Sequence, residues 1–169
     1  SEIDRAVIHV LKHSGRDYQV WDYIPTGYDE RQYCSPGFNL PVGCLMKTPN
    51  GMYPEYHSSA DSLDLVRPEF LAESFSMYTT VLNVIEKNKT YVNQNPKCEP
   101  QLGRRGLYAL VGGQCDRKLQ ETAVLWVLNL SDGEHSLLDI AEQSGLRFDV
   151  IREAADVLLQ HDLLKEVLG

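Results

Sequence analysis

His57 is the side chain in this sequence that is best placed to bind a metal ion. It lies in a polar stretch between a proline-rich segment and a long helical pattern, where a side chain is rarely needed for packing or capping. Neutral imidazole is the commonest metal ligand in proteins. Asp61 and Asp64 follow four and seven residues later, and a carboxylate this close can orient the ring through its second nitrogen. The alternative is a hydrogen-bonded loop histidine with both aspartates capping the helix that begins at Pro68, because one histidine with nearby acids is a weak metal signal.

Three consecutive charged residues, Asp29, Glu30 and Arg31, form a second candidate site. Such a group can bind the ammonium or the carboxylate of a substrate. A structural salt bridge within an ordered loop explains the same residues equally well. The sequence leaves both interpretations open.

Two other patterns carry less weight. His9 and His13 are four residues apart on a helical pattern, which is the spacing of a two-histidine metal pair, but no glutamate follows His9. A solvated helix face is the favoured explanation. Cys34 has no histidine in local sequence to activate it as a nucleophile, which favours a buried thiol.

The first part of the chain must position these side chains, and its pattern is that of an α/β domain. A helical pattern in residues 1–13 is followed by residues 18–24, whose aromatic and β-branched side chains predict a strand. Residues 25–54 hold many prolines and glycines and predict a long irregular loop. Residues 68–87 predict a helix that begins with proline at its favoured first position. The chain begins without methionine inside an amphipathic pattern, so we expect a trimmed piece of a longer polypeptide.

The last part of the chain predicts a helix-turn-helix module. Residues 119–130 have a nearly continuous apolar face, and Ser136 with Asp139 forms a capping-box pattern at the start of a second helix that ends at Gly145. A third helix over residues 148–160 and a short strand over 163–167 favour the winged-helix variant. We therefore expect an α/β domain over residues 1–95, a linker over 96–116 and a winged-helix domain over 117–169.

Composition and charge limit the function further. The 169 residues carry a formal charge of −8, with 43% hydrophobic and 24% charged residues, the balance of a folded, water-soluble protein. Residues 117–169 contain five lysines and arginines against ten aspartates and glutamates. DNA-binding modules usually present a basic face, so DNA is disfavoured as a partner and protein interaction or domain packing is preferred. No segment is apolar enough to span a membrane, and four scattered cysteines are expected to be reduced thiols of a cytoplasmic protein.

Two segments carry a family resemblance. Residues 55–64 (EYHSSADSLD), followed by Pro68 and Glu69, resemble the closing metal-ligand segment of di-zinc aminopeptidases, where a His-Thr/Ser-x-x-Asp stretch precedes a long helix. Residues 27–41 (GYDERQYCSPGFNLP) resemble more narrowly a bacterial family of polysaccharide-biosynthesis proteins with an aminopeptidase-like domain. In that family a winged helix follows the catalytic fold, which is the order found here. The resemblance spans nearly the whole chain and implies the C-terminal portion of such a protein.

By this resemblance, His57 is the last zinc ligand, and Asp29 and Glu30 border the site. Such enzymes take their other ligands and their general-base glutamate from earlier sequence, and no such block is found in these 169 residues. Tyr28 also stands where a small serine is expected. Because a catalytic zinc needs about three protein ligands and hydrolysis needs a base, we expect this chain alone to be inactive as a peptidase. The intact parent would hydrolyse peptide-like or small aminoacyl substrates; the alternative is a non-catalytic winged-helix module that binds a protein partner or self-associates.

Overall fold

The structure is a computed structural model that describes residues 1–107 and 114–167, with the backbone alone described for residues 114–116. It divides the chain into two compact units, unit 1 (Ser1–Ile85) and unit 2 (Glu86–Gly169). Residues 108–113 of the expected linker lie outside the described residues.

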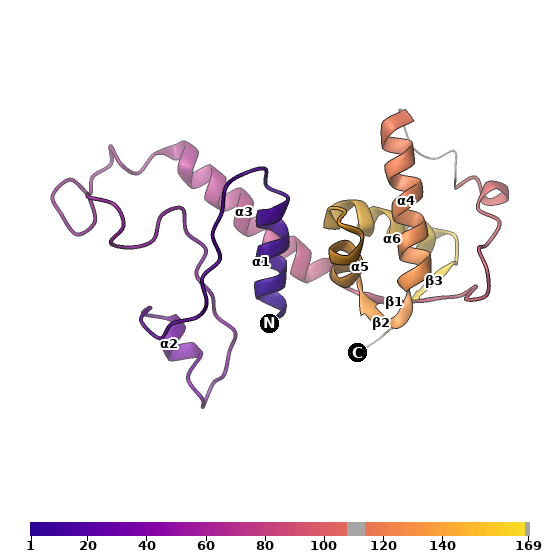
Figure 1. The fold of residues 1–169 in the computed structure, drawn as a ribbon, viewed down its shortest axis with the longest axis horizontal. Coiled ribbons are helices and arrows are strands. Elements are labelled where there is room, and N and C mark those ends of the chain that lie inside the picture. The colour runs from indigo at the N-terminus through magenta and orange to yellow at the C-terminus, as the bar shows by residue number, and fades with distance from the viewer. Residues whose placement is uncertain (108–113, 168–169) are drawn as a thin grey trace. The chain divides into compact units, whose positions relative to one another are not determined.

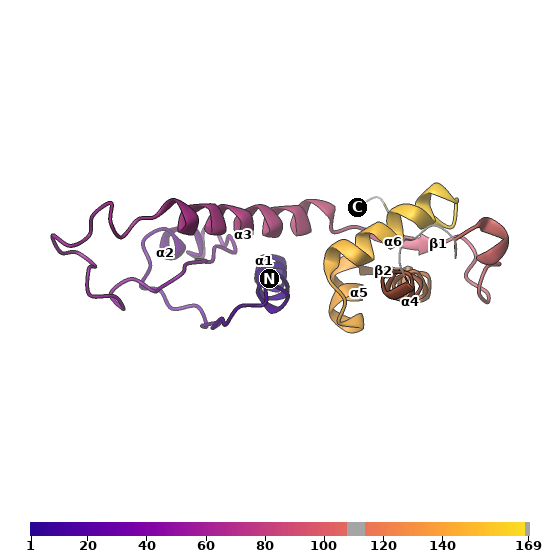
Figure 2. The ribbon, with the colours of Figure 1, turned by 90° about the horizontal axis from the view of Figure 1, so that it is seen from above.

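Unit 1 consists of helices joined by long irregular segments (Figure 1). Its helices are α1 (Glu2–Lys12), α2 (Glu30–Tyr33) and α3 (Pro68–Lys87), which ends just inside unit 2. Figures 1 and 2 both place α1 beside the C-terminal half of α3. Within residues 1–85, all of which the structure describes, the buried apolar side chains are Ala6, Val10, Val81 and Val84. This is too little apolar surface to form a core of its own, because burial of apolar area is the main force that stabilises a fold.

Polar contacts to α3 hold the loops of unit 1. The Glu73 carboxylate forms ion pairs with both Arg16 and Lys47. The Tyr78 hydroxyl donates a hydrogen bond of 2.6 Å to the carbonyl oxygen of Leu45. Exposed contacts of this kind contribute little stability, typically about 0–1 kcal/mol for an ion pair.

The strand expected over residues 18–24 is not formed in this structure. The segment is fully described, and residues 17–24 belong to no helix or strand. Among the residues that the structure describes, none forms a backbone hydrogen bond with the backbone groups of residues 17–23. A β-strand needs a neighbouring strand to pair its N–H and C=O groups, and the described part of unit 1 contains none.

Unit 2 is built on a small antiparallel sheet. Its elements are β1 (Thr90–Asn93), a 3-10 turn (Gly103–Arg105), α4 (Gln114–Leu130), β2 (Asp132–Ser136), α5 (Leu137–Ser144), α6 (Phe148–Gln160) and β3 (Leu164–Glu166). The strand order is β2-β1-β3, so β1 is central. Val92 of β1 stands opposite both Asp132 and Lys165. Gly133 has φ +92°, and an added Cβ would lie 3.2 Å from the Val92 side chain, so any other residue here would strain the backbone and press on β1.

Helices α4, α5 and α6 pack on one another and supply the core of unit 2. The Ser136 side chain accepts a hydrogen bond of 3.2 Å from the Asp139 amide, while the Asp139 carboxylate accepts from the Ser136 amide at 2.7 Å. This is the expected capping box, and Gly145 ends α5 at φ 70° as expected. The fully buried side chains include Val127, Leu138, Ile151 and Leu158. Burying each such side chain contributes about 1.5–3 kcal/mol to the free energy of unfolding. Unit 2 therefore has a stabilising core that unit 1 lacks.

Unit 2 begins earlier in the chain than the sequence indicated. Residues 86–95 were assigned to the first domain, but β1 pairs with β2 and β3. The Asn88 side chain also accepts a hydrogen bond of 2.9 Å from the Leu138 amide at the start of α5. The first domain therefore ends about ten residues before the expected position and the second begins about thirty residues before it, because pairing with distant strands, rather than local composition, decides where β1 belongs.

The predicted fold class, mixed helix and sheet with a C-terminal winged helix, is confirmed. None of the helices in the described part of the chain has the length and apolar character needed to cross a membrane.

Candidate functional site

The His57 ring is exposed and held against a neighbouring aromatic ring. Its backbone has φ 56°, in the left-handed region, which costs a non-glycine residue about 1–2 kcal/mol. The ring stacks on Tyr56 with centroids 4.0 Å apart and planes at 13°, and Tyr53 meets Tyr56 edge-on at 5.5 Å. Stacking fixes the plane of the imidazole, and its exposed edge can present a nitrogen to a ligand from outside the unit.

Asp61 and Asp64 do not orient the His57 ring in this structure. The Asp61 amide donates to the carbonyl oxygen of Ser58 at 3.2 Å, and the Asp64 amide to the Ser62 hydroxyl at 3.3 Å. Neither carboxylate bonds to His57 within the described residues. Across residues 1–107 and 114–167, no group of three histidine, cysteine, aspartate or glutamate side chains is close enough to hold a metal ion. The residues present therefore do not fit a complete zinc site, and His57 remains a single candidate ligand.

The triplet Asp29, Glu30 and Arg31 lies at α2, away from the loop that carries His57 in both views (Figures 1 and 2). Asp29 precedes the helix without capping it, and the Arg31 guanidinium lies 5.7 Å from the centre of the Tyr28 ring. Within the described residues these three side chains form no ion pair. The structure therefore does not bring the two candidate sites together.

Glu30 has a close neighbour that the sequence did not indicate. Partial desolvation raises the pKa of the thiol of Cys44, an exposed residue, and a hydrogen bond to Glu30 raises it further. An added Cβ at Gly27 would overlap the Glu30 carboxylate. A thiol with a raised pKa is protonated near neutral pH and is a poor nucleophile. Gly27 and Cys44 both lie next to the Glu30 side chain, but they are 17 residues apart in the sequence. No local sequence pattern therefore predicts that the two meet at Glu30.

His9, on α1, is buried where the sequence predicted an exposed side chain. A solvated helix face was expected for His9 and His13, but His9 is buried at 5% exposure. The two rings lie 4.6 Å apart, tilted by 46°. The i and i+4 positions share one helix face, and here that face is the buried one.

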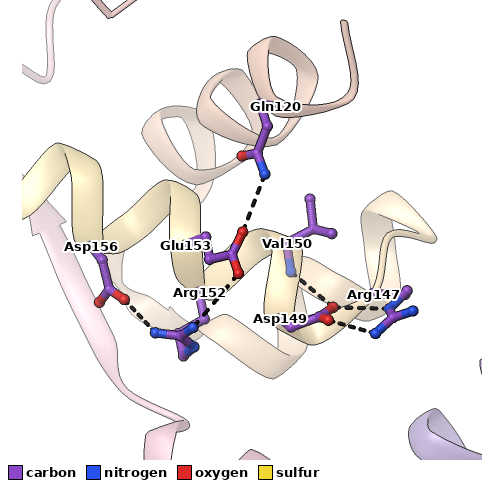
Figure 3. Close-up of polar contacts among 7 residues, drawn as sticks. All are labelled: Gln120, Arg147, Asp149, Val150, Arg152, Glu153 and Asp156. Carbon is purple, nitrogen blue, oxygen red and sulfur yellow. Dashed lines mark hydrogen bonds and ion pairs between the residues drawn. The ribbon is translucent and has the colours of Figure 1, made fainter. Parts of the chain in front are cut away.

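The surface of α6 is the candidate nucleic-acid interface of unit 2, and its arginines are paired with carboxylates (Figure 3). Arg147 binds Asp149 through two hydrogen bonds, of 3.0 and 2.6 Å. Arg152 forms an ion pair with Asp156 and lies 3.9 Å from Glu153. The hydrogen bond to Asp149 raises the pKa of Arg147. Both arginines of the third helix are thus neutralised within the helix itself.

Gln120 of α4 adds a further contact by donating a hydrogen bond of 3.3 Å to Glu153 (Figure 3). Glu153 is thereby tied to α4 as well as to Arg152. The excess of acidic residues over 117–169 does not by itself show which arginine pairs with which carboxylate. The i, i+4 spacing of Arg152 and Asp156 is the signal that predicts this pairing.

Comparisons with known proteins agree with these two units. Residues 1–88 match the family described as domain of unknown function DUF4910, and residues 89–166 match the winged helix-turn-helix family. The chain is 52% identical over 167 residues to the C-terminal part of a Clostridium acetobutylicum protein named for polysaccharide biosynthesis with an aminopeptidase-like domain. That match covers 99% of this chain and 38% of the relative.

A solved structure gives the same result. The crystal structure of a Clostridium acetobutylicum protein named as a peptidase superimposes with a TM-score of 0.88 at 49% identity, covering 98% of this chain and 36% of that chain. This chain spans well under half the length of the relatives it matches. The resemblance to proteins with an aminopeptidase-like domain is confirmed. The chain belongs to the DUF4910 family through residues 1–88 and carries a winged helix-turn-helix domain over residues 89–166.

Proposed function

We propose that this chain is the C-terminal, separately inactive part of an aminopeptidase-like zinc hydrolase, in which His57 supplies one metal ligand. The observation that carries the proposal is 52% identity, over 99% of the chain, to a protein named for an aminopeptidase-like domain. The exposed His57 ring supports it. The remaining ligands and the general base would come from residues beyond these 169, since the described residues hold no metal cluster of their own.

The proposal extends to substrate and setting. The intact hydrolase would cleave peptide-like or small aminoacyl substrates, and the name of the relative links it to polysaccharide biosynthesis. Free thiols at Cys34, Cys44 and Cys98 support a reducing, cytoplasmic setting.

A chimera tests the role of His57. The segment of the Clostridium acetobutylicum relative that matches this chain is replaced by residues 1–169, and zinc content and hydrolysis of aminoacyl-nitroanilides are measured. We expect His57→Ala in the chimera to lower zinc content and to lower the rate by at least about 100-fold, because an open zinc site relies on about three protein ligands. The isolated chain should be inactive with added zinc.

The matched control is His135→Ala, which removes an imidazole from unit 2 that contacts Asp132. It should leave zinc content and rate unchanged. An active His57→Ala chimera with full zinc content would refute the assignment, and so would zinc-dependent activity of the isolated chain that disappears with His57→Ala.

A second proposal concerns unit 2, which we infer binds a protein partner or a second copy rather than DNA. The observation that favours it is the pairing of Arg147 and Arg152 with carboxylates on α6. Phosphate contacts require free cations. Salt-titrated binding to random duplex DNA should show no micromolar affinity; micromolar binding with a steep salt slope would overturn the inference.

A further inference from the structure

A polar pocket in unit 2 lies outside the candidate sites described above. It forms where the turn after α6 meets the segment that joins β1 to α4. Its volume of about 550 Å³ lies within the range of roughly 300–1,000 Å³ that is typical of small-molecule sites. The polar residues that line it are Gln94, Asn95, Gln101, Arg104, Arg105 and Asp162.

The backbone around this pocket is fixed by buried side chains and hydrogen bonds. Leu102 and Leu107, on either side of the 3-10 turn that carries both arginines, are 2% and 7% exposed. The Leu107 amide donates a hydrogen bond of 3.1 Å to the carbonyl oxygen of Leu102. The Gln94 amide donates to the carbonyl oxygen of Leu163 at 2.9 Å, which joins the two segments that line the pocket. A ligand therefore meets a preformed site and loses little affinity to ordering of the protein.

The two arginines of the pocket differ from the other arginines of unit 2. Each of the others forms an ion pair with a nearby carboxylate: Arg117, Arg147 and Arg152. Among the residues that the structure describes, no carboxylate forms an ion pair with Arg104 or Arg105. Arg105 instead donates from Nη1 to the carbonyl oxygen of His161 at 3.2 Å. In a chain with a formal charge of −8, two adjacent arginines without a carboxylate partner favour an anion from outside the chain.

The number of donors favours a phosphate over a carboxylate. A guanidinium binds two oxygens at once through its planar fork. One fork is enough to occupy both oxygens of a carboxylate, whereas a phosphate monoester has three terminal oxygens that two forks can share. Asn95 and Gln101 offer neutral donors and acceptors, and the Asp162 carboxylate can accept from a hydroxyl group. These neighbours fit a ligand whose body carries hydroxyl groups.

We propose that Arg104 and Arg105 bind the phosphate group of a small, hydroxyl-bearing phosphate monoester in this pocket. All the residues involved belong to unit 2, so the proposal is independent of zinc binding by His57. It is also distinct from DNA binding, because duplex binding depends on many phosphate contacts along an extended surface, whereas these two arginines line one pocket.

The test is a titration of the full 169-residue chain followed by ¹H–¹⁵N NMR at constant ionic strength. The probes are glucose 6-phosphate, inorganic phosphate, glucose and acetate. We expect glucose 6-phosphate to shift the amide signals of Gln101, Arg104 and Arg105 in a saturable way. Its Kd should be at least about 10-fold lower than that of acetate or glucose, since hydrogen bonds to charged groups are the strong ones. Inorganic phosphate should shift the same signals with a higher Kd, because it lacks the hydroxyl-bearing body.

Arginine variants test the pocket itself. Arg104→Gln should raise the Kd for glucose 6-phosphate at least about 10-fold by removing charge-assisted hydrogen bonds, and Arg104→Lys should restore only part of the affinity because lysine lacks the fork. Arg104 suits this test because no described residue forms an ion pair with it. The matched control is Arg147→Gln, at an arginine paired with Asp149 on α6, which should leave the Kd unchanged. Thermal unfolding of each variant checks that unit 2 stays folded.

Four results would overturn the proposal. They are the lack of saturable binding by either phosphate, an unchanged Kd in folded Arg104→Gln, acetate binding as tight as that of glucose 6-phosphate, and an equal loss of affinity in Arg147→Gln. Displacement of glucose 6-phosphate by an equimolar random duplex would also overturn it, since the pocket would then belong to a nucleic-acid surface.

Discussion

The boundary of unit 2 leads to a sharp prediction about truncated chains. A fragment of residues 86–169 retains β1, whereas a fragment of residues 117–169, the domain expected from sequence, lacks it. We expect the longer fragment to unfold cooperatively in urea and the shorter one to show no folding transition. The reason is that β1 is the central strand between β2 and β3, so its loss leaves two short strands without a partner.

The size of the effect follows from the contacts of β1. Tyr91 is 6% exposed, and burying about 150–250 Å² of an aromatic side chain contributes about 4–6 kcal/mol at most. Asn93 donates through its amide to Ser131 at 2.7 Å and through its side chain to Leu128 at 2.8 Å, with about 0.5–1.5 kcal/mol expected for each bond. Gln94 also donates to Leu163 at 2.9 Å. These losses are comparable with the whole stability of a small domain, about 5–15 kcal/mol.

The assay is urea denaturation of both fragments followed by far-UV circular dichroism. Tyr91→Ala in the longer fragment is the matched intermediate, and it should lower the free energy of unfolding by about 3–5 kcal/mol. The reasoning is refuted if residues 117–169 unfold cooperatively with a stability within about 1 kcal/mol of residues 86–169.

The remaining predictions concern unit 2 within the full chain. Leu158→Ala should lower its free energy of unfolding by about 2–5 kcal/mol because Leu158 is fully buried, while Leu125→Ala, at an exposed site, should change it by less than about 0.5 kcal/mol; equal effects in urea denaturation would contradict this core. Hydrogen bonds from the amides of His135 and Glu134 lower the pKa of Asp132 from 3.8 to about 2, so its contribution to stability is complete above about pH 4 and is lost as the pH falls through 2. Asp132→Asn should therefore remove part of the acid dependence of stability between those values, and an unchanged pH profile would show that the carboxylate is not stabilised in the folded state. Neutralising Glu153 and Asp156 together (Glu153→Gln, Asp156→Asn) should release Arg152 and steepen the slope of log K for duplex binding against log salt concentration by at most about 0.9. If anisotropy titrations show no change in this slope, Arg152 cannot reach DNA.

Local signals were sufficient for α3 and α5, although they did not indicate α2 (Glu30–Tyr33). The proline at position 68 and the apolar repeat gave the limits of α3 as residues 68–87, as observed. The Ser136–Asp139 capping box and Gly145 set the two ends of α5. These features act within a few residues of one another, so a sequence pattern can contain them completely.

The strands depended on partners that local sequence does not contain. β1 has four residues and is flanked by Asn88, Lys89 and Gln94, so its composition resembles a linker, and only pairing with residues some 40 to 75 positions later makes it a strand. Residues 18–24 show the reverse case, because strong β propensity produced no strand where the described part of unit 1 offers no neighbour. A strand forms only when a second segment pairs with its backbone N–H and C=O groups, so the sequence of one segment alone cannot predict it.

The candidate site was predictable to the same limited degree. The polar surroundings of His57 correctly indicated an exposed loop side chain. Its stacking on Tyr56 and its left-handed backbone are three-dimensional features that spacing does not encode. Orientation of the ring by Asp61 stays a prediction: in this structure the Asp61 carboxylate makes no bond to the ring, and its amide donates to the carbonyl oxygen of Ser58.

The unequal cores of the two units have a consequence for the life of the protein in a cell. Unit 2 has a buried core of its own, whereas the described residues of unit 1 leave many large apolar side chains in contact with water. Surface of this kind is what chaperones and proteases recognise. Degradation would therefore begin in unit 1 and leave a resistant winged-helix remnant.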